Sequence, residues 1–247
     1  MSTPAHARSQ PGDEATAAEL NGFGLGCKAA AKYDEGRALY ERALSLLERG
    51  GDSDQDAIAT LYHNLGGIEH ARGDYAAGEL LARRGLAIRT GLAGANPRDI
   101  AADMVALAAI LDGQERYHEA EHLYLEALRV WGRAPGANAG EIAVALNDLG
   151  AQYAQRGRLE RAADLLQRAA ALKKWSLGPR HPDLAVTLNN LAMLCKRRGD
   201  FAGAAALYAE AVEIFERSLG ADHPKAVTCR ANATRCAAAA REALSGA

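Results

Sequence analysis

The chain has 247 residues, of which 49% are hydrophobic and 24% charged, and its net charge is −2. Binding to nucleic-acid phosphates needs an excess of positive charge, so this balance argues against a nucleic-acid partner. Aromatic residues make up only 5% of the chain, which disfavours a core of strands and favours closely packed helices rich in Ala and Leu.

The chain starts with MSTPAHARSQPGDE, a segment without an apolar run. We therefore expect no signal peptide and a disordered tail over residues 1–14. No stretch approaches the roughly 20 apolar residues of a membrane span, so we expect no membrane association. The four cysteines have no metal or redox spacing and are expected to be reduced thiols: Cys27, Cys195, Cys229 and Cys236. These features together predict a cytoplasmic protein.

From residue 15 onward the sequence repeats with a period of 42 residues. A large apolar residue marks each period, at Tyr33, Tyr75, Tyr117, Leu159 and Phe201. Small residues follow at a fixed distance, at Gly36, Gly78, Ala120, Ala162 and Ala204. A fixed period of this length is typical of stacked structural units that bury their apolar faces against their neighbours.

Taken in chain order, five units account for the repeat: 15–56, 57–98, 99–140, 141–182 and 183–224. The first unit contains Gly22 and Gly26, each of which weakens its first helix by up to about 1 kcal/mol relative to Ala. The third unit has Ala106 at a position where the fifth has Asn190. In these two units the sequence determines the helix boundaries and the groove contacts least well.

The fifth unit shows the helical pattern most clearly. Its first half has apolar residues at i, i+3, i+4 and i+7, namely Leu188, Leu191, Ala192 and Cys195. This spacing predicts one helix, which ends at Gly199 and Asp200. A second apolar stripe begins at Phe201 and predicts a second helix. Each unit is thus predicted to be a pair of helices.

The end of the chain is expected to differ from the repeats. Pro182 and Pro224 each stand at the predicted start of a helix, where a missing N–H group costs nothing. Residues 225–247 predict one more helix, without a second helix to pair with it. Its polar residues suit a capping helix that meets water on one side: Arg230, Arg235, Arg241 and Glu242.

These units resemble the tetratricopeptide repeat. The resemblance is carried by a small residue in the first helix, a Gly between the helices, an aromatic residue at the start of the second helix, and Ala, Tyr and Ala further along it. In the fifth unit these are Ala192, Gly199, Phe201, Ala204, Tyr208 and Ala211. The 42-residue length, the LG–HP linkers at 177–182 and 219–224 and the LNNLA and LNDLG segments are similar to the kinesin-light-chain subfamily. The resemblance implies an all-α, right-handed superhelix (an α-solenoid) of five helix-turn-helix repeats plus a C-terminal capping helix, which binds peptides on a concave face lined by the first helices.

Three positions on each first helix are expected to line that face, because they follow one another at i, i+4 and i+7. The candidate groove consists of polar or large side chains at or beside these positions: Asn21, Lys28, His63, His70, Asp112, Asn147, Asn189, Met193, Lys196 and Arg197. Asn147 and Asn189 can pair with a peptide backbone through their carboxamides. Lys28, Lys196 and Arg197 can hold a carboxylate.

Two alternatives to this groove function remain open. The cations partly match the carboxylate clamp of chaperone-binding members of the family, but Ala151 and Ala154 leave the middle of the groove without polar groups. The Asn side chains can instead bridge neighbouring helices, with the cations simply solvated.

The segment 118–122 matches the zinc-protease pattern H-E-x-x-H, in which two His on one helix face bind the metal. The repeat supplies a simpler cause, because Ala120 is the obligatory small residue and His118 and His122 flank it. No third ligand follows at a zinc-protease spacing. We expect no catalytic residue, no cofactor and no metal site, and adventitious metal binding by the His pair remains as an alternative. Trp131 and Trp175 are expected to pack between repeats.

The sequence therefore favours a protein-binding adaptor or scaffold rather than an enzyme, with a protein or peptide as its partner. A second hypothesis is a sensor of a small molecule or peptide signal, with a pocket lined by His63, His70 and Asp112. A third is a metal-dependent enzyme that uses His118 and His122. The Ala-, Arg- and Gly-rich composition is typical of a GC-rich bacterial genome.

Overall fold

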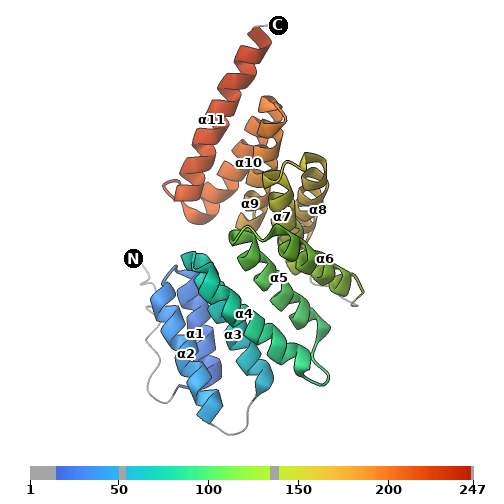
Figure 1. Ribbon diagram of the computed structural model, residues 1–247. Helices are drawn as coiled ribbons and strands as arrows, with labels where there is room; N and C mark the ends of the chain where they lie inside the picture. Colours follow the sequence, from blue (N-terminus) through green and yellow to red (C-terminus); the bar gives the residue numbers. More distant parts are fainter. Residues whose placement is uncertain (1–14, 50–53, 134–138, 246–247) are drawn as a thin grey trace, which may run out of the picture. The chain divides into compact units, whose positions relative to one another are not determined.

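A computed structural model of the chain describes residues 15–49, 54–133 and 139–245 (Figure 1). All regular secondary structure in these ranges is helical, which confirms the predicted all-α class. The helices are α1 (Ala17–Ala29), α2 (Tyr33–Arg49), α3 (Gln55–Arg72), α4 (Tyr75–Gly91), α5 (Pro97–Gly113), α6 (Tyr117–Arg133), α7 (Ala139–Gln155), α8 (Leu159–Leu177), α9 (Pro182–Arg197), α10 (Phe201–Leu219) and α11 (Pro224–Ser245). They form five pairs and a C-terminal helix, as predicted. The predicted tail lies outside the described residues.

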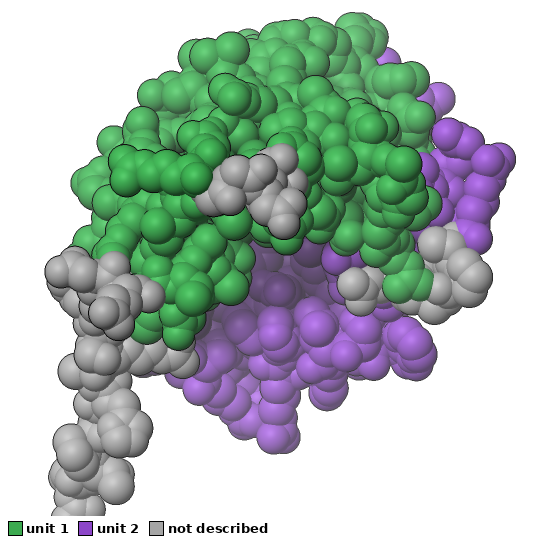
Figure 2. Space-filling model, turned by 90° about the horizontal axis from the view of Figure 1, so that it is seen from below, with its two compact units in different colours: residues 1–127 green, residues 128–247 purple. Residues whose placement is uncertain are grey.

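The contacts divide the chain into two compact units, which Figure 2 shows in different colours: residues 1–127 and 128–247. In the first unit α1 packs on α2, α3 packs on α4, and the odd-numbered helices α1, α3 and α5 also touch one another in sequence order. In the second unit α7 packs on α8, α9 on α10, and α11 on α10. The division falls inside α6 and therefore inside the predicted third repeat.

Helix ends follow the signals in the sequence. Gly73 and Gly199 have φ angles of 79° and 81° and stand directly before the residues that open the next helix. Those residues, Asp74 and Asp200, accept hydrogen bonds from the backbone N–H groups of the first turns of α4 and α10, at 3.1 and 2.8 Å. Pro182 and Pro224 begin α9 and α11, as predicted.

The turn within a pair uses the left-handed conformation even where the sequence lacks a glycine. Ala31 and Glu115 have φ angles of 57° and 61° at the repeat position that Gly73, Gly157 and Gly199 occupy elsewhere. A left-handed residue with a Cβ atom costs about 1–2 kcal/mol. The two turns of the first unit that contain these residues therefore hold backbone strain that the glycine turns avoid.

Small residues in the first helices let large rings approach the helix backbone. A Cβ atom on Gly24 would collide with the ring of Tyr40, so α1 and α2 approach closely only because Gly24 has none. Tyr40 and Tyr208 hold the same repeat position, four periods apart, and both are fully buried in the cores of their units. Burial raises the pKa of both phenols to about 12.

The C-terminal helix buries one side against α10. Cys229 and Cys236 are buried there with Ala226, and all four cysteines of the chain are free thiols. Val227 is 46% exposed, whereas Ala185, one period earlier, is completely buried. Within the described part of the chain no further helix covers this side of α11, as expected of a capping helix.

The prediction for the two tryptophans is half wrong. Trp131 is 1% exposed and packs in the interior, as predicted, but Trp175 is 80% exposed. The repeat position decides the outcome rather than the residue type. Trp131 shares its position with the buried Phe215, whereas Trp175 shares its position with the exposed Arg133 and Arg217.

Candidate functional site

The predicted groove residues lie on one side of the first helices of each pair, which we call the first-helix face. Six of them are half-buried: Asn21, Lys28, His63, His70, Asp112 and Asn189. Three are exposed: Met193, Lys196 and Arg197. Asn147 alone is buried, with 6% of its surface exposed.

Pairs of carboxamides bridge neighbouring first helices in both units. In the first unit Asn64 Nδ2 of α3 donates to Asn21 Oδ1 of α1 at 2.8 Å. In the second unit Asn190 Nδ2 of α9 donates to Asn147 Oδ1 of α7 at 3.1 Å. Both pairs are 43 residues apart, so they are the same contact repeated. The Asn side chains thus link consecutive repeats, as the alternative to groove binding anticipates.

In the second unit these bonds continue into a chain. Cys229 Sγ donates to Asn189 Oδ1 at 3.3 Å, and Asn189 Nδ2 donates to Asn190 Oδ1 at 3.5 Å. Asn190 donates to Asn147, and Asn147 Nδ2 donates to Asp148 Oδ1 at 3.0 Å. This series of hydrogen bonds links α11, α9 and α7, and in it the Asn147 carboxamide both accepts and donates. Of the two Asn residues predicted to bind a backbone, Asn189 is half-buried, whereas only 6% of Asn147 is exposed.

A lysine lies across α3 in the first unit. The Lys28 side chain extends from α1 over Gly67, so that its ammonium occupies the space that a Cβ atom on Gly67 would need. Lys28 makes no ion pair or hydrogen bond with any residue that the structure describes. Burial lowers its pKa below the ordinary value of 10.5. An ammonium held in this way gains free energy from any anion that reaches it.

His70 and Asp112 stand at the same position as Lys28 in the next two first helices. Burial lowers the pKa of His70, and the Lys28 charge lowers it further, while Asp112 and a hydrogen bond to the Ala109 backbone act in the opposite direction. The His70 ring also lies 5.7 Å from the ring of Tyr75. The charges of Lys28 and Asp112, which share the repeat position of His70, thus act on His70 in opposite directions.

A buried charged cluster lies behind His63. Arg89 Nε of α4 donates to Asp103 Oδ2 of α5 at 2.7 Å, and both side chains are 4% exposed. Arg89 also bonds to Asp56 and donates to Thr60 Oγ1 at 3.0 Å. Burial alone would lower the pKa of Arg89, but its bonds to Asp103 raise it above the ordinary value. His63 Nδ1 lies 2.8 Å from Asp103 Oδ1.

The sequence reasoning missed Arg89 and Asp103, although a signal exists. Arg89 shares its repeat position with Trp131, Lys173 and Phe215, and all four are buried. A cation in a position that other repeats fill with an aromatic ring indicates a buried charge that needs a partner.

Apolar side chains remain exposed on the first-helix face of each unit. Leu25 of α1 is 48% exposed and Met193 of α9 is 49% exposed, and they hold the same repeat position. Val144 of α7 is 40% exposed on the same face. Lys28 lies one helical turn beyond Leu25, and Asn189 lies one turn before Met193. Each unit therefore presents an apolar side chain beside a polar group.

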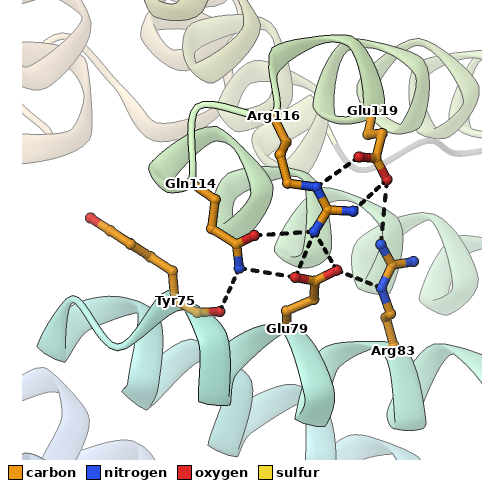
Figure 3. A network of polar contacts seen from close by, with 6 residues as sticks. All are labelled: Tyr75, Glu79, Arg83, Gln114, Arg116 and Glu119. Atoms are coloured by element: carbon orange, nitrogen blue, oxygen red, sulfur yellow. Dashed lines mark hydrogen bonds and ion pairs between the residues drawn. The ribbon is translucent and has the colours of Figure 1, made fainter.

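A network of charges fixes the turn between α5 and α6 to α4 (Figure 3). Arg116 bonds to both oxygens of Glu79 and, through two nitrogens, to both oxygens of Glu119, with all four distances at 2.7 Å. Gln114 Nε2 donates to Glu79 and to the Tyr75 carbonyl, each at 3.0 Å. Burial alone would raise the pKa of Glu79, but the bonds from Arg83, Arg116 and Gln114 lower it to about 2.

His118 and His122 lie on the exposed side of α6. The His122 ring is 79% exposed and lies 3.6 Å from Glu126 Oε2. Among the described residues, no three His, Cys, Asp or Glu side chains are grouped so that they could hold a metal ion. The spacing of the two His follows from the repeat.

Two shallow hollows lie at turns between paired helices. One, of 420 Å³, lies before α2 and is lined by residues 31–35 and Arg72. The other, of 540 Å³, lies before α8 and is lined by residues 157–161. Neither is lined by His63, His70 or Asp112, the residues of the predicted sensor pocket. None of the helices in the described ranges is long and apolar enough to cross a membrane.

Comparison with known families identifies the repeat. Models of the tetratricopeptide repeat match residues 14–91, 99–174 and 184–225. No protein of curated function matches the chain in sequence.

Solved structures of similar fold include light-chain-like and peptide-binding proteins. BtubC (BKLC) from P. vanneervenii is 21% identical with a TM-score of 0.65, over 85% of this chain and 92% of that one. A putative kinesin light chain from Podospora anserina is 16% identical with a TM-score of 0.59, over 81% and 95%. The quorum sensor NprR from B. thuringiensis is 15% identical with a TM-score of 0.70, over 86% of this chain and 57% of that one. At these identities the comparisons establish the fold alone.

Proposed function

The chain belongs to the tetratricopeptide repeat family, and we propose that it is an adaptor whose first-helix faces bind an extended or helical segment of a partner protein. Arrays of this family generally bind proteins or peptides and are typically non-catalytic. We propose accordingly that the chain is not an enzyme, that it needs no cofactor, and that it acts in the cytoplasm.

One observation supports this proposal above the others. Leu25 and Met193 are half-exposed at the same repeat position, on helices whose other large apolar residues are mostly buried. Apolar side chains of this kind, next to polar groups, are typical of surfaces that bind another molecule. A bound segment would cover the apolar side chain and place its polar groups against Asn189 or Lys28.

Lys28 offers the bound segment an anchor for a carboxylate. Its half-buried ammonium has no anionic partner among the described residues, so a carboxylate from the segment would make a charge-assisted hydrogen bond there. Lys196 and Arg197 are exposed at the end of α9 and would hold acidic groups more weakly because water screens them. His70 and Asp112 would contact the same part of the segment.

A sensor of a peptide signal is the second candidate. NprR, which shares the fold, has been solved in complex with its cognate peptide NprX, at 16% identity, a TM-score of 0.69 and coverage of 86% of this chain and 59% of NprR. A sensor differs from an adaptor in that a short free peptide alone changes the conformation. Small-angle scattering with and without a bound peptide distinguishes the two, because an adaptor would keep its scattering profile.

Selection of short random peptides displayed on phage tests the binding proposal. Peptides selected on the wild-type protein should bind at least about tenfold more weakly to Leu25→Asp or Met193→Asp, since a buried charge at the contact costs more than about 1.4 kcal/mol. The matched control is Leu80→Asp, because Leu80 lies on the second helix α4 and is 75% exposed. Equal binding by all three variants would contradict the proposal.

The Asn residues provide a second comparison. Asn189→Ala should weaken binding, since Asn189 retains accessible surface. Asn147→Ala should instead lower stability by about 1–3 kcal/mol, because it removes a buried carboxamide and leaves the half-buried amide of Asn190 without its acceptor. Thermal unfolding of each variant separates a loss of fold from a loss of binding.

A further inference from the structure

The His63 ring is hydrogen-bonded to a buried carboxylate. No other predicted groove residue of the first unit has such a bond among the described residues. Its Nδ1 lies 2.8 Å from Asp103 Oδ1, and the Asp103 side chain is 4% exposed. The His63 side chain itself is 31% exposed, at the first-helix face. One edge of the imidazole is therefore held inside the unit while the rest remains accessible.

The protonation state of Asp103 decides which ring nitrogen of His63 carries the hydrogen. Arg89 is always protonated and donates through Nε to Asp103 Oδ2 at 2.7 Å, so Asp103 is a carboxylate and only accepts hydrogen bonds. A bond of 2.8 Å between Asp103 Oδ1 and His63 Nδ1 then requires a hydrogen on Nδ1. A neutral imidazole carries one N–H group and one acceptor nitrogen, which leaves Nε2 as the acceptor.

No described residue donates to His63 Nε2. We infer that Asp103 and Arg89 are positioning residues that hold His63 in the Nδ1–H form, and that Nε2 is a binding site for an N–H or O–H group of the bound segment. The inference rests on the proposed function, because it specifies what that segment must supply over the first unit. A backbone amide N–H meets the requirement for any amino-acid sequence.

At the same two repeat positions of the second unit, the hydrogen bond runs in the opposite direction. Asn189 corresponds to His63, and Cys229 corresponds to Asp103, each pair being 40 residues apart. Cys229 donates to Asn189 Oδ1, so the Asn189 oxygen is occupied and its amide N–H groups point to other acceptors, including Met193 Sδ at 3.8 Å. The first unit therefore presents an acceptor at this position, whereas in the second unit the Asn189 oxygen and amide N–H groups already have partners.

The nitrogen resonances of His63 test the first half of this inference without any partner. Nitrogen-15 NMR at about pH 8, where an ordinary imidazole is neutral, should show the hydrogen on Nδ1 of His63. His122, exposed on α6, is the internal control and should show the usual Nε2–H form. Asp103→Asn should move the hydrogen of His63 to Nε2, since an amide can donate to Nδ1. A wild-type His63 in the Nε2–H form overturns the inference, whether or not Asp103→Asn folds.

A peptide selected on phage against the wild-type protein tests the second half. Replacing its amide bonds one at a time by esters removes one N–H group at each step. One replacement should weaken binding to the wild type about three- to tenfold, the range expected for one hydrogen bond. The same replacement should leave binding to His63→Ala unchanged. If every ester weakens binding to the wild type and to His63→Ala equally, Nε2 is not the acceptor. A failure to select any peptide contradicts the proposed function instead.

Discussion

The ammonium of Lys28 occupies the space beside Gly67 that any other residue at position 67 would fill with its Cβ atom. Gly67→Ala should therefore push Lys28 away from α3 and return its pKa toward 10.5. Because Ala is about 0.8–1 kcal/mol better than Gly in a helix interior, the variant should be as stable as the wild type or slightly more stable. NMR titration of the Lys28 side chain and urea unfolding measure the two effects.

The same substitution should change how stability depends on pH. The pKa of Lys28 is lower in the folded than in the unfolded chain, so the folded state loses its proton first as pH rises. Between the lowered pKa and 10.5 the unfolded state binds more protons, and wild-type stability should rise in that window. Gly67→Ala should lack this contribution. An unchanged Lys28 pKa in the variant would show that Gly67 does not hold the lysine in place.

Two buried cations at one repeat position should respond oppositely to replacement by methionine. Arg89 is paired with the buried Asp103, so Arg89→Met leaves that carboxylate without its cation and should cost about 3–5 kcal/mol. Lys173 is 3% exposed and donates to the Asp183 carbonyl at 3.2 Å, and burial lowers its pKa. Lys173→Met should be neutral or stabilise by about 1–2 kcal/mol, because Trp131 and Phe215 show that the position accepts apolar groups. Urea unfolding compares the two, and a large loss of stability in Lys173→Met would show that the nearby charges of Asp148 and Asp183 offset the burial of Lys173.

The left-handed turn at Glu115 predicts a stabilising substitution. Glu115→Gly should raise stability by about 0.5–1 kcal/mol, since removing the Cβ atom relieves the strain at a φ of 61° and the greater freedom of Gly in the unfolded chain takes back part of the gain. The converse control is Gly157→Ala, which places a Cβ atom at a φ of 75° and should cost about 1 kcal/mol. Thermal unfolding of the pair gives the sign directly, and a loss of stability in Glu115→Gly would contradict the strain.

The charge network around Glu79 should make the first unit sensitive to acid. The pKa of Glu79 is about 2 in the folded protein, below its ordinary value of 4.5. The contribution of Glu79 is therefore complete above its unfolded pKa and is lost as pH falls from about 4.5 toward 2. Glu79→Gln should be less stable than the wild type at neutral pH, and the gap should narrow in acid. Denaturant unfolding across this pH range measures the difference in free energy of unfolding between the two proteins. That difference would stay constant if the network did not lower the pKa of Glu79.

The repeat allowed the architecture to be predicted from sequence, because position within the period fixes what each side chain meets. Gly24, Tyr40 and Tyr208 lie where the period places them, and Pro182 and Pro224 start helices. Predictions from residue type fail where a residue differs in kind from the residues at the same position of the other repeats. Trp175 is exposed because its position faces water in the other repeats.

The candidate site was less predictable, because its geometry depends on partners from two or three helices. The sequence places Lys28, His70 and Asp112 at one repeat position, but only the structure shows Lys28 lying across Gly67. The pairing of His63 with Asp103 joins residues 40 apart and depends on Arg89 from a third helix. The groove role of the Asn residues stays a prediction, and Asn147 is the member whose burial most restricts it.

Site-specific photocrosslinking tests most directly whether a partner binds the first-helix face. A photoreactive amino acid would replace Leu25, Met193 or, as the control on a second helix, Leu80, and the protein would be irradiated with a peptide selected on the wild type. We expect crosslinks from position 25 or 193 and none from position 80. Crosslinking from position 80 alone would show that the partner binds the second helices and would contradict the proposed function.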